Sequence, residues 1–338
     1  MKRIFVFVLM VALTAGAVFA QNAVYGRARL NLGADLALSP EEVNPAWVFL
    51  PHFRMGVRGG NDSVRFFGQV DINTNDANAN VLGTWRANAT VDIGDVELSI
   101  GRNELPWFRA SSLALFGNSN DGFGASSSNV VGYVTAGYAG AYLGLTSAGR
   151  VHGRSTDRFP FPGFFAGYDY RAETFSVGAA FAGLFGTFPT VQPAIPIDSY
   201  NVFSWMCKAH ARFVVNPATI GLNVAFYGAP SYGFHNLSPV ASIVGGRNAM
   251  VLESMLDVNI RLAFCTIGIT GAFVANFAEE AYGGGGSAFR AGLSANFDVG
   301  GGFRIIPGLM YTHFLKGAGG ADVDNTTLTV GVTFLFAF

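Results

Sequence analysis

Apolar and polar residues alternate along almost the whole chain, beginning near residue 23. Between Ala23 and Leu38 every second position is apolar or small, and the positions between them carry Arg27, Arg29 and Asp35. A period of two indicates a β-strand with one apolar and one polar face. This segment is long for a strand of a soluble protein, where about five or six residues are usual. It suits a tilted strand that crosses a lipid bilayer and extends beyond it.

The same alternation recurs to the end of the chain, and its parity changes at each turn. The sequence predicts sixteen strands, at 23–38, 47–58, 64–73, 85–93, 96–102, 130–137, 141–147, 164–170, 175–185, 203–213, 219–227, 250–261, 265–277, 288–297, 303–314 and 326–338. Short turns and long loops alternate strictly between these strands. An even number of antiparallel strands connected in this way is typical of bacterial outer-membrane barrels, which must close because lipid cannot satisfy an open sheet edge. We therefore predict an all-β fold, a 16-stranded antiparallel transmembrane β-barrel.

Aromatic residues near the strand ends are expected to form the two girdles that such a barrel places at the membrane interfaces. They are Tyr25, Trp47, Trp85, Tyr168, Tyr170, Trp205 and Tyr311.

The connection at 103–129 differs from the other long loops. It is too long for a hairpin turn and too rich in Asn, Ser and Gly for a continuous helix. It also holds a large apolar cluster, formed by Leu105, Trp107, Phe108, Leu113, Leu115, Phe116 and Phe123. Because a solvated loop has no need of these side chains, we expect this loop to fold against another part of the protein.

Composition narrows the class further. Only 13% of the 338 residues are charged and 50% are hydrophobic, whereas about a quarter of a soluble globular chain is charged. No run of 18 apolar residues follows the N-terminal segment, which excludes helical membrane spans there. A soluble β-sandwich or propeller is the alternative, but it does not explain why nearly every strand has one entirely apolar face. The net charge of −1 gives no indication of nucleic-acid binding.

Residues 1–20 are typical of a secretory signal peptide. Lys2 and Arg3 are followed by an apolar run, and Val18 and Ala20 occupy the positions expected before a cleavage site. An N-terminal anchor helix is less favoured, because the run is short for a membrane span. We therefore expect export and a mature barrel at 21–338.

The sequence contains no clear catalytic or metal-binding pattern. Cys207 and Cys265 are expected to be free thiols on the outward faces of two non-adjacent strands. The histidines lack metal-ligand spacing. The segment 118–122 is similar to part of a calcium loop but lacks the later bidentate Glu, which favours a simple turn. We expect no cofactor, no metal and no enzymatic activity.

Two segments resemble a known family. The sequence Ile100-Gly101-Arg102-Asn103 is similar to the segment that precedes the third loop of Gram-negative general porins, and the terminal Phe338 resembles the C-terminal signal of outer-membrane barrels. The resemblance implies an outer-membrane location, recognition of Phe338 by the barrel-assembly machinery, and a third loop that folds inward to narrow the pore. Porin-like barrels are often homotrimers, and the strands at 130–185, which are small and apolar on both faces, are a candidate for the subunit contact. The resemblance implies a constriction loop that includes Glu104, Trp107, Phe108, Arg109 and Asp121.

The alternation along each strand predicts which charged side chains face the lumen, because these lie between the apolar positions. The basic ones are Arg27, Arg29, Arg54, Arg58, Arg65, Arg86, Lys208, Arg212, Arg261, Arg290 and Arg304, and the acidic ones are Asp35, Asp71, Asp92, Glu97, Asp169, Glu253 and Asp257. In porins an arginine ladder opposes carboxylates of the inward loop, which implies Arg27, Arg29, Arg54, Arg65 and Arg86 opposite Glu104 and Asp121. The alternative is a charged, water-filled lumen without an ordered ladder. His210 lies between Lys208 and Arg212 and is expected to belong to a solvated row of charges.

The predicted function is passive diffusion of small hydrophilic solutes and ions through a water-filled porin channel. The surplus of basic lumen residues predicts a weak anion preference, since rings of charged side chains set the selectivity of such pores. Three alternatives remain open at this point: a substrate-specific transporter, a surface adhesin or antigen on a barrel scaffold, and, less favoured, a barrel hydrolase.

Overall fold

The computed structural model describes residues 23–38, 45–73, 82–104, 130–146, 163–188, 200–228, 250–277, 285–316 and 326–338. They form sixteen strands, as predicted: β1 Ala23–Ala37, β2 Pro45–Gly60, β3 Val64–Asn73, β4 Leu82–Ile93, β5 Val96–Glu104, β6 Val130–Tyr138, β7 Ala141–Thr146, β8 Gly163–Arg171, β9 Phe175–Phe188, β10 Tyr200–Val215, β11 Ala218–Gly228, β12 Met250–Arg261, β13 Thr266–Asn276, β14 Ser287–Gly300, β15 Phe303–Lys316 and β16 Thr326–Ala337. No helix in these ranges is long and apolar enough to cross a membrane.

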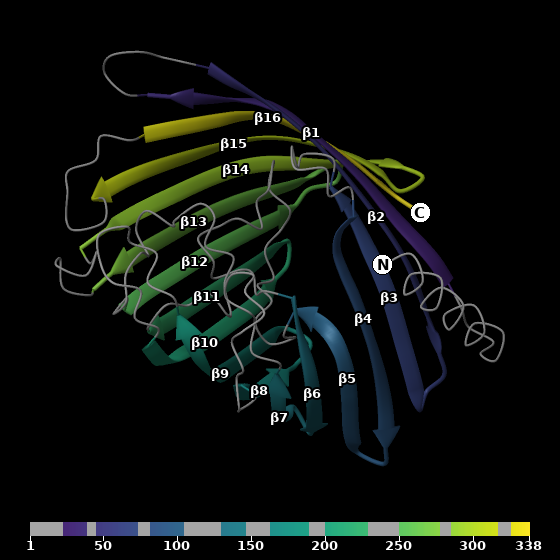
Figure 1. Cartoon of the computed structure of the whole chain (residues 1–338). Helices are drawn as coiled ribbons and strands as arrows, with labels where there is room; N and C mark the ends of the chain where they lie inside the picture. The colour runs from purple at the N-terminus through teal and green to yellow at the C-terminus, as the bar shows by residue number, and fades with distance from the viewer. Residues whose placement is uncertain are drawn as a thin grey trace.

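The sixteen strands form one closed antiparallel barrel. Each strand pairs with the next one along the chain, and β16 returns to pair with β1 (Figure 1). The predicted fold class is confirmed. The inward fold of the third loop stays a prediction, because 105–129 lie outside the described residues, and so does the signal peptide at 1–20.

The predicted start of the third loop needs a correction. The third loop was expected to begin at 103, but β5 continues to Glu104, because the backbones of Asn103 and Glu104 still pair with Val131 and Val130 of β6. The side chain of Glu104 lies outside the described part of the structure. Any constriction loop therefore begins at 105.

The alternation of the sequence becomes two faces of the barrel wall. Large apolar side chains cover the outside; Trp47 is 85% exposed and Val24 is 67% exposed. The inside carries polar side chains together with buried apolar ones such as Met206 and Val251. There Asn31 of β1 is fully buried and accepts a hydrogen bond from the Thr333 hydroxyl of β16. An apolar outer band with a polar interior is what a barrel in a bilayer requires.

The girdle prediction needs one correction. Trp47, Trp85, Tyr168 and Tyr170 are exposed on the outer face, as expected. Tyr25 lies on the inner face instead, where its hydroxyl donates a hydrogen bond to Oε1 of Gln69 at 3.2 Å. Tyr25 and Arg27 are two residues apart on β1 and therefore share a face. The alternation of the sequence thus excludes an outward position for Tyr25.

Both cysteines are free thiols. Cys207 is exposed on the outer face of β10, as predicted. Cys265 is buried, so its predicted outward position is wrong. It lies in the turn between β12 and β13, where its carbonyl accepts the N–H of Leu262, and the strand alternation does not apply there.

The first and last strands are joined by hydrogen bonds between Gly26 and Phe338. Gly26 donates its N–H to the carbonyl of Phe338 at 2.8 Å, and Phe338 donates its N–H to the carbonyl of Gly26 at 3.1 Å. The Phe338 ring lies over Gly26, and a Cβ at that position would collide with it. The terminal residue therefore completes the seam that closes the barrel.

The turn between β2 and β3 fixes the register of the arginine-bearing strands. Oδ1 of Asn61 accepts the N–H groups of Ser63 and Val64, at 3.0 and 2.8 Å. Gly60 has a φ of 131°, a conformation that favours glycine. This turn pairs Gly60 with Arg65 and, further along the hairpin, Arg54 with Asp71.

The outer face gives a direct test of the barrel in lipid. Leu309 of β15 is 43% exposed and lies between Leu293 of β14 and Val330 of β16. We expect Leu309→Arg to destabilise the barrel in bilayers by about 2–4 kcal/mol, because it places a charge on the lipid face. Met310→Arg is the matched control, since it adds the same charge to the opposite face. Equal losses in urea unfolding from lipid vesicles would contradict the assignment of the two faces.

Candidate functional site: a basic inner wall on β1–β4

Six arginines predicted to face the lumen come from four consecutive strands. We call this set the basic inner wall, formed by Arg27 and Arg29 of β1, Arg54 and Arg58 of β2, Arg65 of β3 and Arg86 of β4. Their positions alternate with those of the exposed apolar residues of the same strands, which include Met55 and Trp85. The basic residues therefore lie on the face of the wall that does not meet lipid.

Strand register sorts these arginines into rows across the wall. Arg27 lies directly opposite Arg54, and Arg54 lies directly opposite Asp71 on the next strand. In the neighbouring row, Arg29 lies opposite His52. The rows bring four of the predicted ladder residues, Arg27, Arg29, Arg54 and Arg86, to one region of the inner wall.

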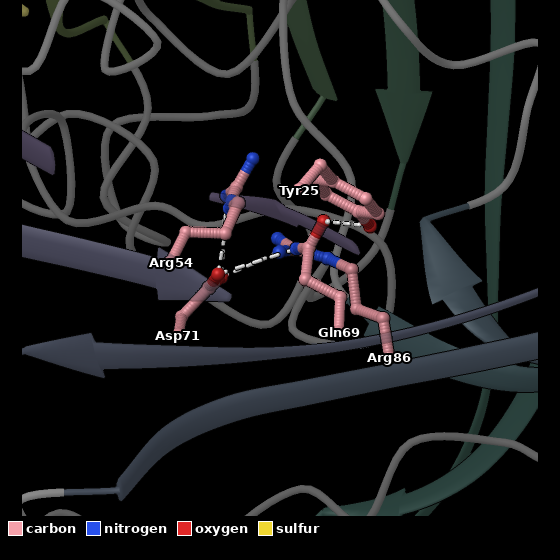
Figure 2. Close-up of polar contacts among 5 residues, drawn as sticks. All are labelled: Tyr25, Arg54, Gln69, Asp71 and Arg86. Atoms are coloured by element: carbon pink, nitrogen blue, oxygen red, sulfur yellow. Dashed lines mark hydrogen bonds and ion pairs between the residues drawn. The ribbon is translucent and has the colours of Figure 1, made fainter. Parts of the chain in front are cut away.

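Asp71 holds two of these arginines at once. Arg54 donates from Nε to Oδ1 at 2.7 Å and from Nη2 to Oδ2 at 3.2 Å, while Arg86 donates from Nη1 to Oδ2 at 2.5 Å (Figure 2). The Asp71 side chain is only 9% exposed, against 13% for Arg86 and 28% for Arg54. A two-pronged arginine–carboxylate pair is geometrically specific. Asp71 therefore fixes the direction in which both guanidinium groups point.

A series of hydrogen bonds connects Tyr25 of β1 to Asp71 through Gln69. Tyr25 donates to Oε1 of Gln69, and Gln69 donates from Nε2 to Oδ1 of Asp71 at 3.2 Å. Figure 2 shows these side chains beside the two arginines. Four adjacent strands thus contribute to one connected network, which a single strand could not form.

A second cluster surrounds Arg65 near the short turns. Its Nη2 donates to Oδ1 of Asp92 at 2.9 Å and to Oε2 of Glu97 at 2.8 Å. These side chains line a hollow of about 620 Å³ together with Asp62 and Asp95. Arg65 is 52% exposed, so this pair is open to water and its charges are well screened.

The predicted partners of the arginines were acids of the third loop, but their described partners are on the wall itself. Asp121 lies outside the described residues, and so do Trp107, Phe108, Arg109 and the side chain of Glu104. The described partners are Asp71, Asp92 and Glu97, on the strands that carry the arginines or on β5. The described residues thus form ordered pairs between neighbouring strands, and the opposition of the arginines to Glu104 and Asp121 stays a prediction.

The other predicted lumen residues form separate groups. Asp35 accepts a hydrogen bond from the Thr329 hydroxyl across the β1–β16 seam. Lys208 of β10 is only 3% exposed. His210 lies 3.1 Å from Oδ1 of Asp169, which also binds Arg171.

The expected solvated row of Lys208, His210 and Arg212 is therefore wrong at Lys208, whereas the His210 side chain is 22% exposed and Arg212 is exposed. On the same part of the wall Glu253 of β12 is fully buried. Burial therefore differs between the charged side chains of the inner wall: Lys208 and Glu253 are buried, whereas Arg65 is 52% exposed. Strand parity alone could not have given this difference, because burial depends on contacts beyond the strand.

The described residues contain no group of three or more metal-ligating side chains. Tyr25 and Gln69 are the site residues that the sequence did not indicate. The parity that Tyr25 shares with Arg27 would have placed it on the inner face.

Comparison with known proteins identifies the fold. No protein-family model and no curated protein matches the sequence. Among solved structures, an anion-selective porin from Comamonas acidovorans superposes with a TM-score of 0.63 at 12% identity, over 94% of this chain and 100% of that one. The outer-membrane channel DcaP of Acinetobacter baumannii gives 0.66 at 10% identity, over 95% and 98%. Salmonella typhi OmpF gives 0.63 at 15% identity, over 93% and 97%.

The chain has a porin-like β-barrel fold. The resemblance predicted from Arg102 and Phe338 is confirmed at the level of the fold. At these identities the likeness extends to the strand framework, and the basic inner wall has to be interpreted from this chain's own residues.

The network around Asp71 makes a prediction about selectivity and stability. We expect Asp71→Asn to move the reversal potential in a KCl gradient toward the chloride equilibrium potential, because it removes the negative charge that Arg54 and Arg86 share. It should also cost stability, up to the roughly 3–5 kcal/mol lost when one partner of a buried pair is removed.

Asp298→Asn is the matched control. Asp298 pairs with Arg304 at 3.7 Å, and both side chains are about half exposed or more, at 66% and 47%. Its loss should cost less than about 1 kcal/mol. A reversal potential for Asp71→Asn that stays constant or moves toward potassium would contradict the role of Asp71.

Proposed function

We propose that this protein is a bacterial outer-membrane porin that lets small hydrophilic solutes and ions diffuse passively through a water-filled channel. The observation that carries the proposal is a closed 16-strand barrel with an apolar outer face and arginines along its inner wall. A barrel of this strand number is wide enough for an aqueous channel. The porin-like fold supports the same function, and channel activity requires no catalytic residue.

We propose a weak anion preference for this channel. Arginines keep their charge at any physiological pH, and four of them lie in one region of the wall with Asp71. The anion-selective porin from Comamonas acidovorans, which has the same fold, supports this preference. Asp92 and Glu97 near the turns add negative charge beside Arg65, so the preference is expected to be weak.

Location and assembly are proposed on the same basis. Residues 1–20 would direct export, and the mature barrel would enter the outer membrane through the assembly machinery, which would recognise Phe338. Phe338 is 56% exposed, and its ring contacts that of Phe336 on the outer face. The apolar outward residues of β6 and β7, which include Val134, Leu143 and Leu145, would suit a homotrimer contact.

We also propose that the third connection narrows the channel. Its apolar cluster requires packing partners, and its place between β5 and β6 is the one at which porins fold a loop inward. With few carboxylates, it would restrict the channel more by bulk than by charge.

Planar-bilayer recording of the purified full-length protein tests these proposals. We expect stable conductance steps and a reversal potential on the anion-selective side. Deletion of 107–121 should enlarge the step, because it removes bulk from the channel. Strong cation selectivity would contradict the basic wall as the selectivity element, and an unchanged step after the deletion would contradict the constriction. An absence of steps from correctly folded barrels would contradict the channel itself.

A further inference from the structure

The row that contains Arg27 and Arg54 has an arrangement that a diffusion channel alone does not require. Two arginines lie directly opposite each other on β1 and β2. Like charges in directly opposite positions destabilise a pair of strands. A ligand of opposite charge between them would turn this repulsion into attraction.

The two arginines differ in how they are paired. Arg54 is held by Asp71 through Nε and Nη2. Arg27 forms no hydrogen bond or ion pair with any side chain in the described part of the chain, and its Nε is shielded from water without an acceptor. A buried donor left without an acceptor costs free energy. Because no described side chain pairs with Arg27, its guanidinium keeps N–H donors for an incoming acceptor.

The surroundings hold the second arginine in a fixed direction. Asp71 occupies one edge of the Arg54 guanidinium, and Gln69 and Tyr25 support Asp71 in turn. Figure 2 shows one terminal nitrogen of Arg54 pointing away from Asp71. Arg54 therefore keeps N–H groups for a further acceptor and is held in position before that acceptor arrives. Preorganisation of this kind increases affinity, because less side-chain freedom is lost on binding.

The chemistry of guanidinium groups selects the ligand class. Each presents several N–H groups in a rigid plane that matches the oxygens of phosphate and carboxylate. Chloride is a single atom and has no such match. Two guanidiniums from adjacent strands, with Arg29 two residues further along β1 on the same face, suit a compact anion with several oxygens and more than one negative charge.

We infer that Arg27 and Arg54 form a binding site for phosphate or a phosphate-bearing solute on the inner wall of the barrel. The inference deepens the proposed channel function and rests on it for transport, although binding itself does not require conduction. A solute held here would lie against the basic wall while it crosses the channel.

Inorganic phosphate tests the site in the full-length protein. In planar bilayers we expect phosphate to reduce the chloride current in a saturable way, with acetate at equal ionic strength having little effect. Arg27→Gln should raise the half-blocking concentration by about tenfold or more, the loss expected for one hydrogen bond to a charged group. Arg27→Lys keeps the charge but loses the fork and should give an intermediate value.

Arg212→Gln is the matched control, because it removes one lumen arginine from β10, outside the basic inner wall. It should leave the half-blocking concentration unchanged. Circular dichroism and heat-dependent gel mobility establish that each variant is folded. The inference is overturned if phosphate acts no more strongly than acetate, or if Arg27→Gln and Arg212→Gln respond equally.

Calorimetric titration of phosphate into the detergent-solubilised barrel separates this inference from the proposed channel. Binding without conductance steps would support the site and contradict the channel. Conductance steps without phosphate binding or block would support the channel and contradict the site.

Discussion

The pairing of β1 with β16 is the constraint on which the rest of this structure depends. Lipid offers no hydrogen-bond partner to an open strand edge, so a sheet in a membrane has to close. Here closure extends from Arg27 opposite Ala337 to Ala37 opposite Thr327, and the two hydrogen bonds between Gly26 and Phe338 complete it. The inner side of the seam is polar, with Asn31 bound to Thr333 and Asp35 bound to Thr329. Once the sheet closes, every strand acquires one face toward lipid and one toward the interior.

Those two faces, together with strand register, create the basic inner wall. Arginines spaced two residues apart on one strand share a face, and the turn at Asn61 sets which residues oppose them on the next strand. Asp71 therefore lies opposite Arg54 and near Arg86, although the three residues are far apart in sequence. The same register leaves Arg27 opposite Arg54 with no acid between them. The proposed anion preference and the proposed phosphate site thus share one cause, the order of residues across four paired strands.

Much of this arrangement could be predicted from the sequence, because a period of two specifies both the strands and their inner faces. This alternation predicted the sixteen strands and the inward position of Arg54 and Asp71. It could also have placed Tyr25 inside. It could not show that Lys208 and Glu253 are buried while Arg65 is half exposed, since burial depends on contacts between distant segments. It likewise could not show that Gln69 links Tyr25 to Asp71, because side-chain hydrogen bonds depend on register across several strands.

The arginine-bearing face of β1–β4 is expected to meet water and the opposite face to meet lipid. Thiol accessibility of two adjacent residues distinguishes these environments, in a background with Cys207→Ser and Cys265→Ser. With the protein in lipid vesicles, Arg54→Cys should react rapidly with a charged, membrane-impermeant thiol reagent, whereas Met55→Cys should remain unreactive. Rapid reaction of Met55→Cys with no reaction of Arg54→Cys would contradict the account.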